Sequence, residues 1–537
     1  MTEKKSKFIV VAGSIMSGLG KGIVTASICK LLAIRDYKVV PIKFDGYLNI
    51  DCGTMNPFRH GEVFVLDDGT EVDMDFGTYE RFLNINVSGN SSITGGKLFQ
   101  RIIQKERKGE YLGRDVQFVP HLTDEIKNWV KNVGAETNSD IVLIEVGGTV
   151  GDLENGYFLE AMRQLMAEEE CMFIQLSYLP SLSEGEQKTK PTQQATRLLQ
   201  SLGIQPHMII CREQEKLTSE ARTKISLYCN VPEKAVVDDP FIETVYELPL
   251  VLEKQGLYDI IAEKLKLRKD TDGIEAWRKI VNRVIEPAKK ELDIGLIGKY
   301  TAVKDAYVSV KEAIVHAAAA IDHKVKITFV ESAELEKFDD ITHIIDGFDG
   351  IVVPGGFGKR GIEGKIKAIK HARESKKPYL GLCLGMQLMV IEYARNVCGL
   401  SEANSTEFDK KVLHKVVKIL PEKESMLDMG GTLRLGGQDV IIKKDTRAYE
   451  AYNSELARER FRHRYEINPE YIQQLEENGL VFSGRAPKGN IMQIAEIMEH
   501  PFFMGTQFHP ELSSRLESPS PMFLGFMKAC AKNKEVE

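Results

Sequence analysis

Short apolar runs rich in β-branched residues alternate with longer segments of helical periodicity along the whole chain. This alternation is typical of parallel β-sheets that are covered by helices. In the first half of the chain it predicts strands at Phe8–Ala12, Val39–Phe44, Ile141–Val146, Met172–Leu176 and His207–Cys211. In the second half it predicts strands at Asp293–Ile297, Val325–Val330, Gly350–Val353, Pro378–Leu382 and Phe502–Gln507. The predicted fold class is therefore α/β, with two doubly wound domains.

The two sets of strands are separated by a segment with a different pattern, Ala262–Lys290. It carries clusters of charge and no predicted strand, so we place the domain boundary there. The predicted division is a first domain at residues 1–268, a linker at 269–290 and a second domain at 291–537. Within the second domain, Lys411–Leu456 is rich in glycine and charge, and we expect an antiparallel β-ribbon in it.

The composition is that of an ordinary globular protein, because 43% of the 537 residues are hydrophobic and 28% are charged. A formal charge of −7 argues against a nucleic-acid or anionic-membrane surface. The first apolar run is too short for a signal peptide, and none of the runs approaches the ~18 residues of a membrane span. Eight cysteines are scattered without a Cys-x-x-Cys pair, which favours reduced thiols and a cytoplasmic protein.

A glycine-rich segment, Gly13–Gly22, joins the first predicted strand to a helical pattern. Glycines let backbone N–H groups converge on phosphate oxygens, the helix N-terminus adds positive potential, and Lys21 can neutralise charge. The spacing departs from the standard phosphate loop, because Gly13 and Lys21 are two residues further apart and Gly22 replaces the usual Ser or Thr. A plain glycine-rich turn is the alternative, which the strand–loop–helix order disfavours.

Magnesium at such a loop would need carboxylates from elsewhere in the chain. Asp73 and Asp75 lie in an acidic loop, and Glu145 ends a predicted buried strand. Carboxylates at the ends of parallel strands lie beside the phosphate-binding edge of a doubly wound sheet. Glu145 is therefore the strongest candidate, whereas a solvated loop explains either aspartate taken alone.

Two more polar segments of the first half could contact a ligand. Lys188–Gln193 holds two amines and two hydroxyls around Pro191, which keeps the segment from continuing a helix. Such a group can bind a triphosphate or a developing negative charge, and an exposed basic loop is the alternative. Gly53–Glu62 is a long polar loop around His60, which taken alone is better explained as structural.

In the second half, Cys383 lies between Gly381 and Gly385, after a predicted strand and before a helical pattern. This is the layout of a nucleophile elbow, in which a tight turn exposes the thiol and the helix N-terminus favours the thiolate. His509 and Glu511 offer a base and an orienting carboxylate two residues apart. Together the three side chains predict acyl transfer by a thiol, against the alternative of a buried structural cysteine.

These residues belong to longer motifs through which the chain resembles the CTP synthase family over essentially its whole length. The motifs are Ser17–Gly22, Tyr47–Asp51 with Gly53–Met55, His60–Val65, Gly147–Asp152, Lys188–Gln193, Cys229–Pro232 and Asn404–Phe408. The motifs of the first half are specific to this family, whereas many class I amidotransferases share the cysteine elbow. The resemblance implies an N-terminal P-loop-like (Rossmann-like) synthase domain and a C-terminal class I glutaminase domain.

The resemblance also implies the reaction. ATP phosphorylates the 4-oxygen of UTP, and ammonia released from glutamine then displaces the phosphate to give CTP. Mg²⁺ accompanies ATP, GTP promotes glutamine hydrolysis, and CTP inhibits by feedback. Relatives are homotetramers that sometimes form filaments, so we expect small-molecule substrates and further copies of the chain as partners, with no nucleic acid and no membrane.

The resemblance implies a set of contacts in the first domain. For ATP these are Gly18, Leu19, Gly20, Lys21, Gly22, Ile23 and Asp75, and for Mg²⁺ they are Asp75 and Glu145. For UTP or CTP they are Ser17, Asp152, Leu153, Glu154, Lys188, Thr189, Lys190, Pro191, Thr192, Gln193 and Lys224. Lys43 and Lys190 are implied to stabilise the phosphorylated intermediate, and His60 aligns with a residue that gates the passage of ammonia.

In the second domain the resemblance implies that Cys383 is the nucleophile, His509 its base and Glu511 the group that orients the base. The implied glutamine contacts are Gly356, Leu384, Gly385, Met386, Gln387, Glu407 and Arg464. A carboxylate and a guanidinium suit the substrate's ammonium and carboxylate groups. The glycines of Gly355–Gly358 suit an oxyanion hole, and Phe357 and Arg360 are candidates for GTP contacts by position.

The sequence departs from many relatives at Gly46 and Cys52, which lie in loops near the nucleotide residues. Three other functions would account for part of the sequence. A different ATP-dependent amidotransferase, such as a cobyrinic acid amide synthase, is disfavoured by Lys188–Gln193. A partitioning-type ATPase leaves the second half unexplained, and a regulatory, filament-forming protein with an inactive glutaminase is opposed by the complete set of Cys383, His509 and Glu511.

Overall fold

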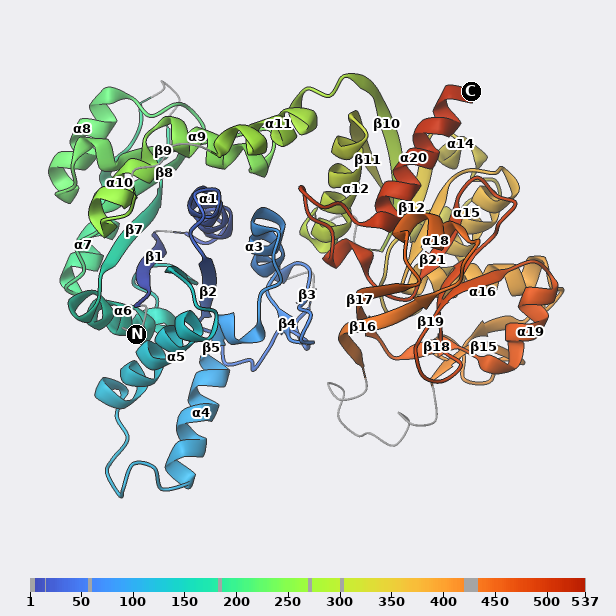
Figure 1. Ribbon diagram of the computed structural model, residues 1–537, viewed down its shortest axis with the longest axis horizontal. Helices are drawn as coiled ribbons and strands as arrows, with labels where there is room; N and C mark the ends of the chain where they lie inside the picture. Colours follow the sequence, from blue (N-terminus) through green and yellow to red (C-terminus); the bar gives the residue numbers. More distant parts are fainter. Residues whose placement is uncertain are drawn as a thin grey trace. The chain divides into compact units, whose positions relative to one another are not determined.

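The computed structural model describes residues 5–14, 16–56, 60–181, 186–268, 273–299, 304–419 and 433–536. The chain divides into two compact units (Figure 1). The first unit comprises Met1–Cys52 and Thr78–Val281, and the second comprises Gly53–Gly77 and Asn282–Glu537. The segment Gly53–Gly77 therefore leaves the first half of the chain and packs as part of the second unit. Within the described ranges, no helix has both the length and the apolarity to span a membrane.

The first unit is built on a seven-stranded, parallel sheet with the order β5-β2-β6-β1-β7-β8-β9. Its strands are β1 (Lys7–Ser14), β2 (Val39–Asp45), β5 (Ser92–Thr94), β6 (Ile141–Val146), β7 (Cys171–Tyr178), β8 (Met208–Glu213) and β9 (Val236–Pro240). The connections that leave β1 and β6 run in opposite directions along the sheet. In doubly wound sheets, ligands bind where neighbouring connections diverge in this way, at the carboxyl ends of the strands.

Helices cover both faces of this sheet. They are α1 (Lys21–Ala33), α3 (Asp75–Leu83), α4 (Gly95–Arg107), α5 (Thr123–Glu136), α6 (Gly156–Glu168), α7 (Lys190–Ser201), α8 (Ser219–Cys229), α9 (Leu248–Lys254), α10 (Leu257–Leu265) and α11 (Ile274–Ile285). Alternate strand residues such as Val10 and Ile144 pack with Leu98 of α4, Ile126 of α5 and Phe158 of α6 in one apolar cluster. On the opposite face, α1 packs together with α9 and α10.

The second unit holds a nine-stranded sheet with the order β11-β10-β12-β13-β21-β20-β19-β16-β17. Its strands are β10 (Lys289–Gly298), β11 (His323–Glu331), β12 (Gly350–Val353), β13 (Tyr379–Leu382), β16 (Arg434–Ile442), β17 (Leu456–His463), β19 (Val481–Arg485), β20 (Met492–Glu496) and β21 (Phe503–Thr506). The five strands from β11 to β21 are parallel, and the rest pair antiparallel. The prediction of an antiparallel ribbon within Lys411–Leu456 is wrong in its bounds: β16 lies in that segment, but its antiparallel partner β17 begins at Leu456 and runs to His463. Residues 420–432 of the segment lie outside the described ranges.

Smaller elements complete the second unit. Two short sheets are formed by β14 (Ala403–Ser405), β15 (His414–Ile419) and β18 (Tyr465–Ile467), and by β3 (Phe64–Val65) and β4 (Glu71–Val72). Its helices are α12 (Val308–Ala320), α13 (Ser332–Leu335), α14 (Thr342–Ile345), α15 (Ile362–Glu374), α16 (Leu384–Asn396), α18 (Arg447–Tyr452), α19 (Pro469–Glu477) and α20 (Pro521–Val536).

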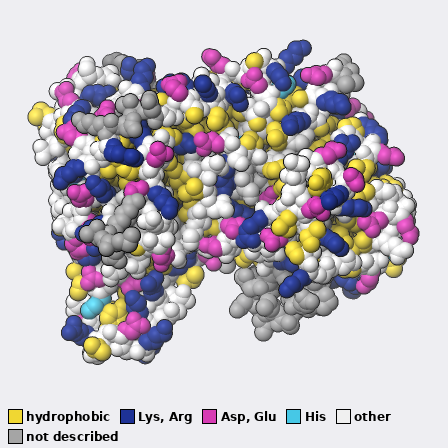
Figure 2. Space-filling model, in the orientation of Figure 1, with side chains coloured by type: hydrophobic (Ala, Val, Ile, Leu, Met, Phe, Trp, Pro, Cys, Tyr) yellow, Lys and Arg dark blue, Asp and Glu magenta, His cyan; other side chains and the backbone are white. Residues whose placement is uncertain are grey.

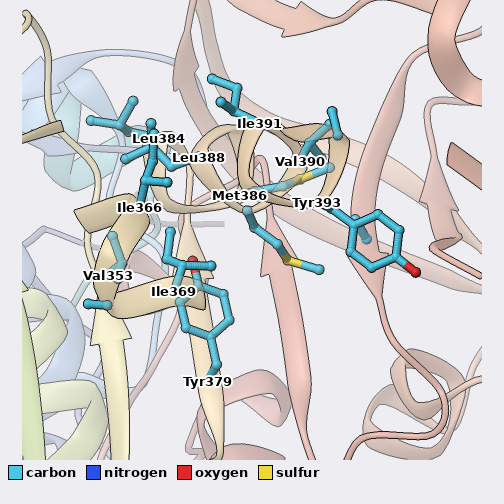
Figure 3. Packing of buried hydrophobic residues seen from close by; sticks show 14 of the residues in the cluster. Val353, Ile366, Ile369, Tyr379, Leu384, Met386, Leu388, Val390, Ile391 and Tyr393 are labelled. Atoms are coloured by element: carbon cyan, nitrogen blue, oxygen red, sulfur yellow. The ribbon is translucent and has the colours of Figure 1, made fainter. Parts of the chain in front are cut away.

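The core of the second unit has two layers because successive side chains of a strand point to opposite faces of the sheet. Val353 and Tyr379 pack against α15 and α16, where Ile366, Met386 and Tyr393 fill the space above them (Figure 3). Their chain neighbours in β12 and β13 face the other way and pack against α12 and α20. The two helical layers hold the parallel strands in place, and with them the loops at the carboxyl ends of these strands.

Every predicted strand overlaps a strand of the structure, and the α/β class with two doubly wound domains is confirmed. The predicted linker contains helix α11, and the border between the two units falls inside it, at Val281 and Asn282. The linker residues 269–272 lie outside the described ranges.

On the face drawn in Figure 2, acidic and basic side chains intermingle, which agrees with the small net charge.

Trp277 anchors helix α11 on the first unit. Its side chain is 1% exposed, its ring lies 5.8 Å from that of Phe82, and its Nε1–H donates a hydrogen bond of 3.0 Å to the carbonyl oxygen of Tyr246. The amine of Lys30 lies 4.2 Å from the centroid of the indole ring. The indole therefore joins the C-terminal helix of this unit to its first helix.

We expect Trp277→Ala to lower the free energy of unfolding of the first unit by about 3–5 kcal/mol, because it leaves a large cavity and an unpaired carbonyl. The remaining tryptophan, Trp129, lies in the same unit, so its fluorescence during denaturant unfolding measures the loss. Arg278→Ala removes an exposed side chain of the same helix and should change the free energy by less than about 0.5 kcal/mol. Equal losses in the two variants would contradict the anchoring role of the indole.

Candidate functional site

The carboxyl ends of three neighbouring parallel strands meet in the second unit. Cys383 follows β13, the turn at residues 354–358 follows β12, and His509 lies just beyond β21. Because β12, β13 and β21 are adjacent and parallel, the loops that leave them converge at one edge of the sheet. The predicted thiol, base and oxyanion residues are thereby brought together from segments far apart in sequence.

Cys383 has an unusual backbone conformation. Its φ is 53° and its ψ is −99°, a region that residues other than glycine rarely adopt. Its N–H donates a hydrogen bond of 2.7 Å to the carbonyl oxygen of Thr506, and its carbonyl accepts one of 3.2 Å from Gln387 in the first turn of α16. A Cβ at Gly385 would lie 2.2 Å from the carbonyl oxygen of Val353, so only glycine allows the helix to begin this close to β12. The turn therefore fixes the thiol at the N-terminus of α16.

The thiol of Cys383 is largely enclosed by polar atoms. It is 5% exposed, its Sγ lies 3.6 Å from Nε2 of Gln507 and 3.9 Å from the carbonyl oxygen of Arg462. A Cβ at Gly355 would come within 3.0 Å of Cε1 of His509 and 3.6 Å of Cβ of Cys383. Gly355 thus leaves the room in which the thiol and the imidazole stand next to each other.

His509 is paired with Glu511 through Nδ1 and Oε1, which are 2.7 Å apart. Burial opposes a charge on the imidazole, but the carboxylate of Glu511 and the neighbouring thiol outweigh it and raise the pKa of His509 well above its usual value. Glu511 is itself 4% exposed, so the pair is shielded from water. The raised pKa favours a charged imidazole beside the thiol, an arrangement that suits a thiolate nucleophile.

Two buried lysines hold the turn at residues 354–358. Nζ of Lys365 donates to the carbonyl oxygen of Pro354 at 3.2 Å, and Nζ of Lys299 donates to those of Phe357, at 3.2 Å, and Gly358. Since peptide groups are planar and trans, a carbonyl held on one side turns the adjoining N–H to the other side. The N–H of Gly358 accordingly donates to Oε1 of Glu407, at 2.8 Å. The N–H groups of Gly355 and Gly358 are thereby oriented away from the ammonium groups.

Neither lysine was identified from the sequence. Burial lowers the pKa of Lys365 to about 7 and that of Lys299 to about 8. A sequence signal exists for Lys365, because it interrupts the apolar stripe of α15 between Ile362 and Ile369. A lysine at such a position is buried and needs a partner. Here the partner is a backbone carbonyl of the functional loop.

The predicted glutamine contacts surround the same turn. Gly385 and Gln387 lie in the first turn of α16, and Nε2 of Gln387 donates to the carbonyl oxygen of Tyr465 at 3.1 Å. Burial raises the pKa of Glu407, while Lys299 and Arg464 oppose this increase. Leu384 and Met386 point into the apolar core (Figure 3). These two residues can therefore contact a ligand only through their backbones, which the sequence motif does not reveal.

In the first unit, the predicted phosphate loop connects β1 to α1. Gly18 and Gly20 have φ angles of 75° and 86°, so both need the left-handed conformation that glycine adopts freely. Nζ of Lys21 donates to the carbonyl oxygen of Gly148 at 2.8 Å. This bond joins the loop after β1 to the loop after β6, at the edge where the connections diverge. Ile15 lies outside the described residues.

Internal hydrogen bonds hold the loop after β6 in place. The N–H of Thr149 donates to Oδ2 of Asp152 at 2.8 Å, and Nδ2 of Asn155 donates to the carbonyl oxygens of Gly147 and Thr149 at 3.1 and 2.7 Å. The next residue after Asp152, Leu153, is 93% exposed. The segment Asp152–Glu154, which is predicted to contact the product CTP, therefore exposes the apolar side chain of Leu153, while internal hydrogen bonds hold its backbone in place.

The segment Lys188–Gln193 divides into anchoring and exposed residues. Helix α7 begins at Lys190, so Pro191 lies in its first turn, where the missing N–H costs no hydrogen bond. Thr192 is fully buried and its hydroxyl accepts a hydrogen bond of 2.9 Å from Ser177 of β7. Gln193 donates to the hydroxyl of Thr189 at 3.0 Å. These side chains fix the start of the helix, which leaves the lysines to interact with a ligand.

The lysines of this region gather around the start of α7. Lys188 pairs with Glu186 at 2.5 Å, and Lys224 of α8 pairs with Glu220 at 2.6 Å. The pKa of Glu186 is lowered first by Lys188 and also by Lys224. Nζ of Lys190 lies 5.6 Å from the ring of Tyr228. Lys188 and Lys190 thus lie at the N-terminus of α7, and Lys224 lies on the neighbouring helix α8.

The two predicted Mg²⁺ ligands lie in different units. Glu145 is 1% exposed in β6 and accepts a hydrogen bond from the hydroxyl of Tyr79, whereas Asp75 belongs to the second unit, at the start of α3. Within the described ranges, no group of three or more His, Cys, Asp or Glu side chains could hold a metal. Hard carboxylate oxygens suit Mg²⁺, which usually combines one or two of them with phosphate oxygens and water. The donor set therefore fits a metal that arrives with a nucleotide.

Pro57–Arg59, beside His60, lie outside the described ranges.

We expect Lys365→Met to raise the thermal midpoint relative to wild type more at pH 6.5 than at pH 9.5. Between about pH 7 and 10.5 the unfolded lysine binds a proton that the folded one lacks, so the stability of the wild type rises with pH across this range. Below that range the folded protein keeps a buried charge, which the methionine removes. Melting curves of the full chain across the pH series measure the difference. Lys370→Met alters an exposed residue of the same helix, and a similar pH-dependent difference there would contradict the explanation.

Comparisons with known proteins cover both units. A family described as "CTP synthase N-terminus" matches residues 7–267, and one described as "Glutamine amidotransferase class-I" matches residues 302–529. The CTP synthase of Archaeoglobus fulgidus is 51% identical over 534 residues, which cover 99% of each chain, and that of Bacillus subtilis is 46% identical over 528 residues, 98% of each. The solved glutaminase domain of Trypanosoma brucei CTPS with bound acivicin is 40% identical, covers 45% of this chain and 94% of that one, and has a TM-score of 0.43.

Proposed function

The chain belongs to the CTP synthase family, and on that premise we propose how its residues share the reaction. It is a ligase that forms a C–N bond, with ATP as a substrate and glutamine as the nitrogen source. The observation that carries the assignment of roles is the position of Cys383 beside the pair of His509 and Glu511 in one unit, while the other unit carries the predicted phosphate loop. One chain thus holds a site that can release ammonia and a site that can activate an oxygen for displacement.

We assign glutamine hydrolysis to Cys383, His509 and Glu511. The thiolate of Cys383 attacks the side-chain amide carbon, and the amide nitrogen takes a proton from His509 and leaves as ammonia. Water then attacks the thioester, gives its proton to His509 and releases glutamate, which regenerates the thiol. Glu511 holds the imidazole through Nδ1 and keeps it charged until the leaving group needs the proton.

The turn at residues 354–358 is our proposal for the oxyanion hole. Its carbonyls are held by Lys299 and Lys365, so its N–H groups are oriented before the tetrahedral intermediate forms. Glu407 and Arg464 would bind the ammonium and carboxylate of glutamine. The glutamine contacts proposed at the backbone are Gly356, Leu384, Gly385, Met386 and Gln387.

The first unit would carry out the phosphorylation and amination of UTP. The 4-oxygen of UTP attacks the γ-phosphorus of ATP with loss of ADP, ammonia then attacks C4, and inorganic phosphate leaves. ATP would lie on the loop Gly18–Ile23, where Lys21 neutralises phosphate charge, and Mg²⁺ held by Asp75 and Glu145 would shield the transferring group. UTP would contact Ser17, the segment Lys188–Gln193 and Lys224, with Lys43 and Lys190 on the phosphorylated intermediate.

We also propose how the enzyme is regulated and how its copies assemble. We assign feedback inhibition by CTP to Asp152–Glu154 and activation by GTP to contacts that include Phe357 and Arg360, and we expect His60 to gate ammonia. The family resemblance supports a homotetramer and filament formation. A cytoplasmic location is supported by the eight cysteines, all within the described residues and none in a disulfide.

Cys383→Ala should lower glutamine-dependent CTP formation on the order of 10³-fold or more, because no other group can form the thioester. External ammonia should still support synthesis at the wild-type rate, since the first unit is unchanged. A spectrophotometric assay of UTP to CTP conversion with ATP, Mg²⁺ and either nitrogen source measures both rates. Loss of both activities would contradict a division of labour between two sites.

Lys21→Ala should lower synthesis by roughly 10²- to 10³-fold with either nitrogen source, because it removes the amine that we place on the ATP phosphates. The same assay applies, with Lys38→Ala as the control, since Lys38 is an exposed residue just before β2 of the same sheet. Full synthesis by the Lys21 variant would show that ATP binds elsewhere.

A further inference from the structure

Three arginines of β17 share one face and contact the segment Gly53–Gly77. They are Arg458, Arg460 and Arg462, spaced two residues apart, so their side chains point to the same side of the strand. Each has a partner in the segment. Nη2 of Arg458 lies 2.9 Å from Oδ2 of Asp67, Nη1 of Arg460 donates to the carbonyl oxygen of Val65 at 3.1 Å, and Nε of Arg462 donates to Oε1 of Glu71 at 2.7 Å.

The segment also approaches the β16–β17 ribbon very closely. The N–H of Gly437 donates to the carbonyl oxygen of Asp67 at 2.8 Å, and a Cβ at Gly436 would lie 2.5 Å from the backbone nitrogen of Gly69. Glycines in β16 therefore allow a backbone contact that a side chain would block. The contact is thus built into the fold of the second unit by both side chains and backbone.

The pair of Arg462 and Glu71 differs from the pair of Arg458 and Asp67 in burial. The side chain of Arg462 is 18% exposed and that of Glu71 is 5% exposed, whereas Arg458 and Asp67 are 53% and 30% exposed. Removing one partner of a buried pair leaves the other charge without compensation, whereas an exposed pair contributes little. The buried pair can therefore hold its surroundings in place, and the exposed pair is a matched control on the same strand.

Arg462 also touches the catalytic centre at two points. Its carbonyl oxygen lies 3.9 Å from Sγ of Cys383, and its guanidinium lies 5.7 Å from the ring centroid of Phe357, in the turn that we assign to the oxyanion hole. Two residues earlier in β17, the carbonyl of Arg460 accepts a hydrogen bond of 2.8 Å from the N–H of His509. The backbone of β17 thus borders both the nucleophile and its base.

We propose that Glu71 is a positioning residue for glutamine hydrolysis, which acts through its ion pair with Arg462 to fix β17 and the Phe357 turn against the thiol. Glu71 touches neither the thiol nor the imidazole, and all of its effect passes through the arginine. This rests on the proposed glutaminase role of Cys383. The same segment reaches Asp75, the residue that we assign to ATP and Mg²⁺, four residues after Glu71.

The test compares full-length Glu71→Gln with Asp67→Asn, two variants that each neutralise one acidic partner of a β17 arginine. Three quantities are measured: kcat and KM for glutamate release from glutamine, the rate of CTP formation with external ammonia, and the rate of alkylation of Cys383 by iodoacetamide, followed by mass spectrometry of its peptide. The alkylation rate reports the state of the thiol without requiring turnover.

For Glu71→Gln we expect kcat for glutamine hydrolysis to fall about tenfold to a hundredfold, because small displacements of reacting groups have effects of this size. KM should change little, alkylation of Cys383 should slow, and ammonia-dependent synthesis should be retained. Asp67→Asn should resemble the wild type in all three measurements. Arg462→Gln combined with Glu71→Gln should be no worse than Arg462→Gln alone, since the two residues act as one unit.

Unchanged hydrolysis and alkylation in Glu71→Gln would overturn the proposal. An equal loss in Asp67→Asn, or an equal loss of ammonia-dependent synthesis in Glu71→Gln, would overturn it as well, because either result indicates general destabilisation. Failure of the underlying function is distinguishable, since the wild type would then release no glutamate from glutamine, while the comparison of alkylation rates would still test whether Glu71 controls the thiol.

Discussion

The parallel direction of neighbouring strands is the constraint on which both functional regions depend. Parallel strands bring their carboxyl ends, and the loops that leave them, to one edge of a sheet. In the second unit this edge gathers Cys383 and His509, from β13 and β21, with the turn after β12. In the first unit the same arrangement lets Lys21, after β1, bond to Gly148, after β6. Residues separated by more than a hundred positions therefore meet without any long-range contact of their own being required.

Buried charged side chains hold the loops at the carboxyl edge of the second sheet in place. Lys299 and Lys365 are buried beneath the turn at residues 354–358, and this burial lowers the pKa of both ammonium groups. The turn carbonyls accept hydrogen bonds from these ammonium groups, which offsets part of the free-energy cost of burying them. The same hydrogen bonds fix the carbonyls in place. Cys383 stores strain in its backbone in a similar way. In each case stability is given up to hold polar groups in the orientation that the proposed chemistry needs.

The sequence predicts most of the buried parallel strands of the two large sheets, because a strand that is covered on both faces is a continuous apolar run, but it misses β5 and β9. It fails for β3 and β4, which have two residues each and no periodicity, so the departure of Gly53–Gly77 to the second unit is not predicted. That transfer depends on arginines of β17, almost four hundred positions away in the chain, and on the small size of Gly436 and Gly437.

Side-chain roles are harder to predict than side-chain types. The motif Lys188–Gln193 marks a polar segment, but only the fold separates Thr192, which is buried against β7, from the lysines beside it. Lys365 interrupts the apolar stripe of α15, which indicates that its position faces inward, but only the fold shows that its partner is the carbonyl oxygen of Pro354. Such roles arise from tertiary contacts, which local patterns do not encode.

One chain is expected both to release ammonia from glutamine and to use that ammonia to form CTP. This can be tested with glutamine labelled with ¹⁵N in its side-chain amide, supplied with ATP, Mg²⁺, UTP and an excess of unlabelled glutamate, and with mass spectrometry of the product. We expect CTP to carry ¹⁵N at its exocyclic amine, and the label to be lost when Cys383 is replaced by alanine. Unlabelled CTP from the wild type, or labelled CTP from the alanine variant, would contradict it.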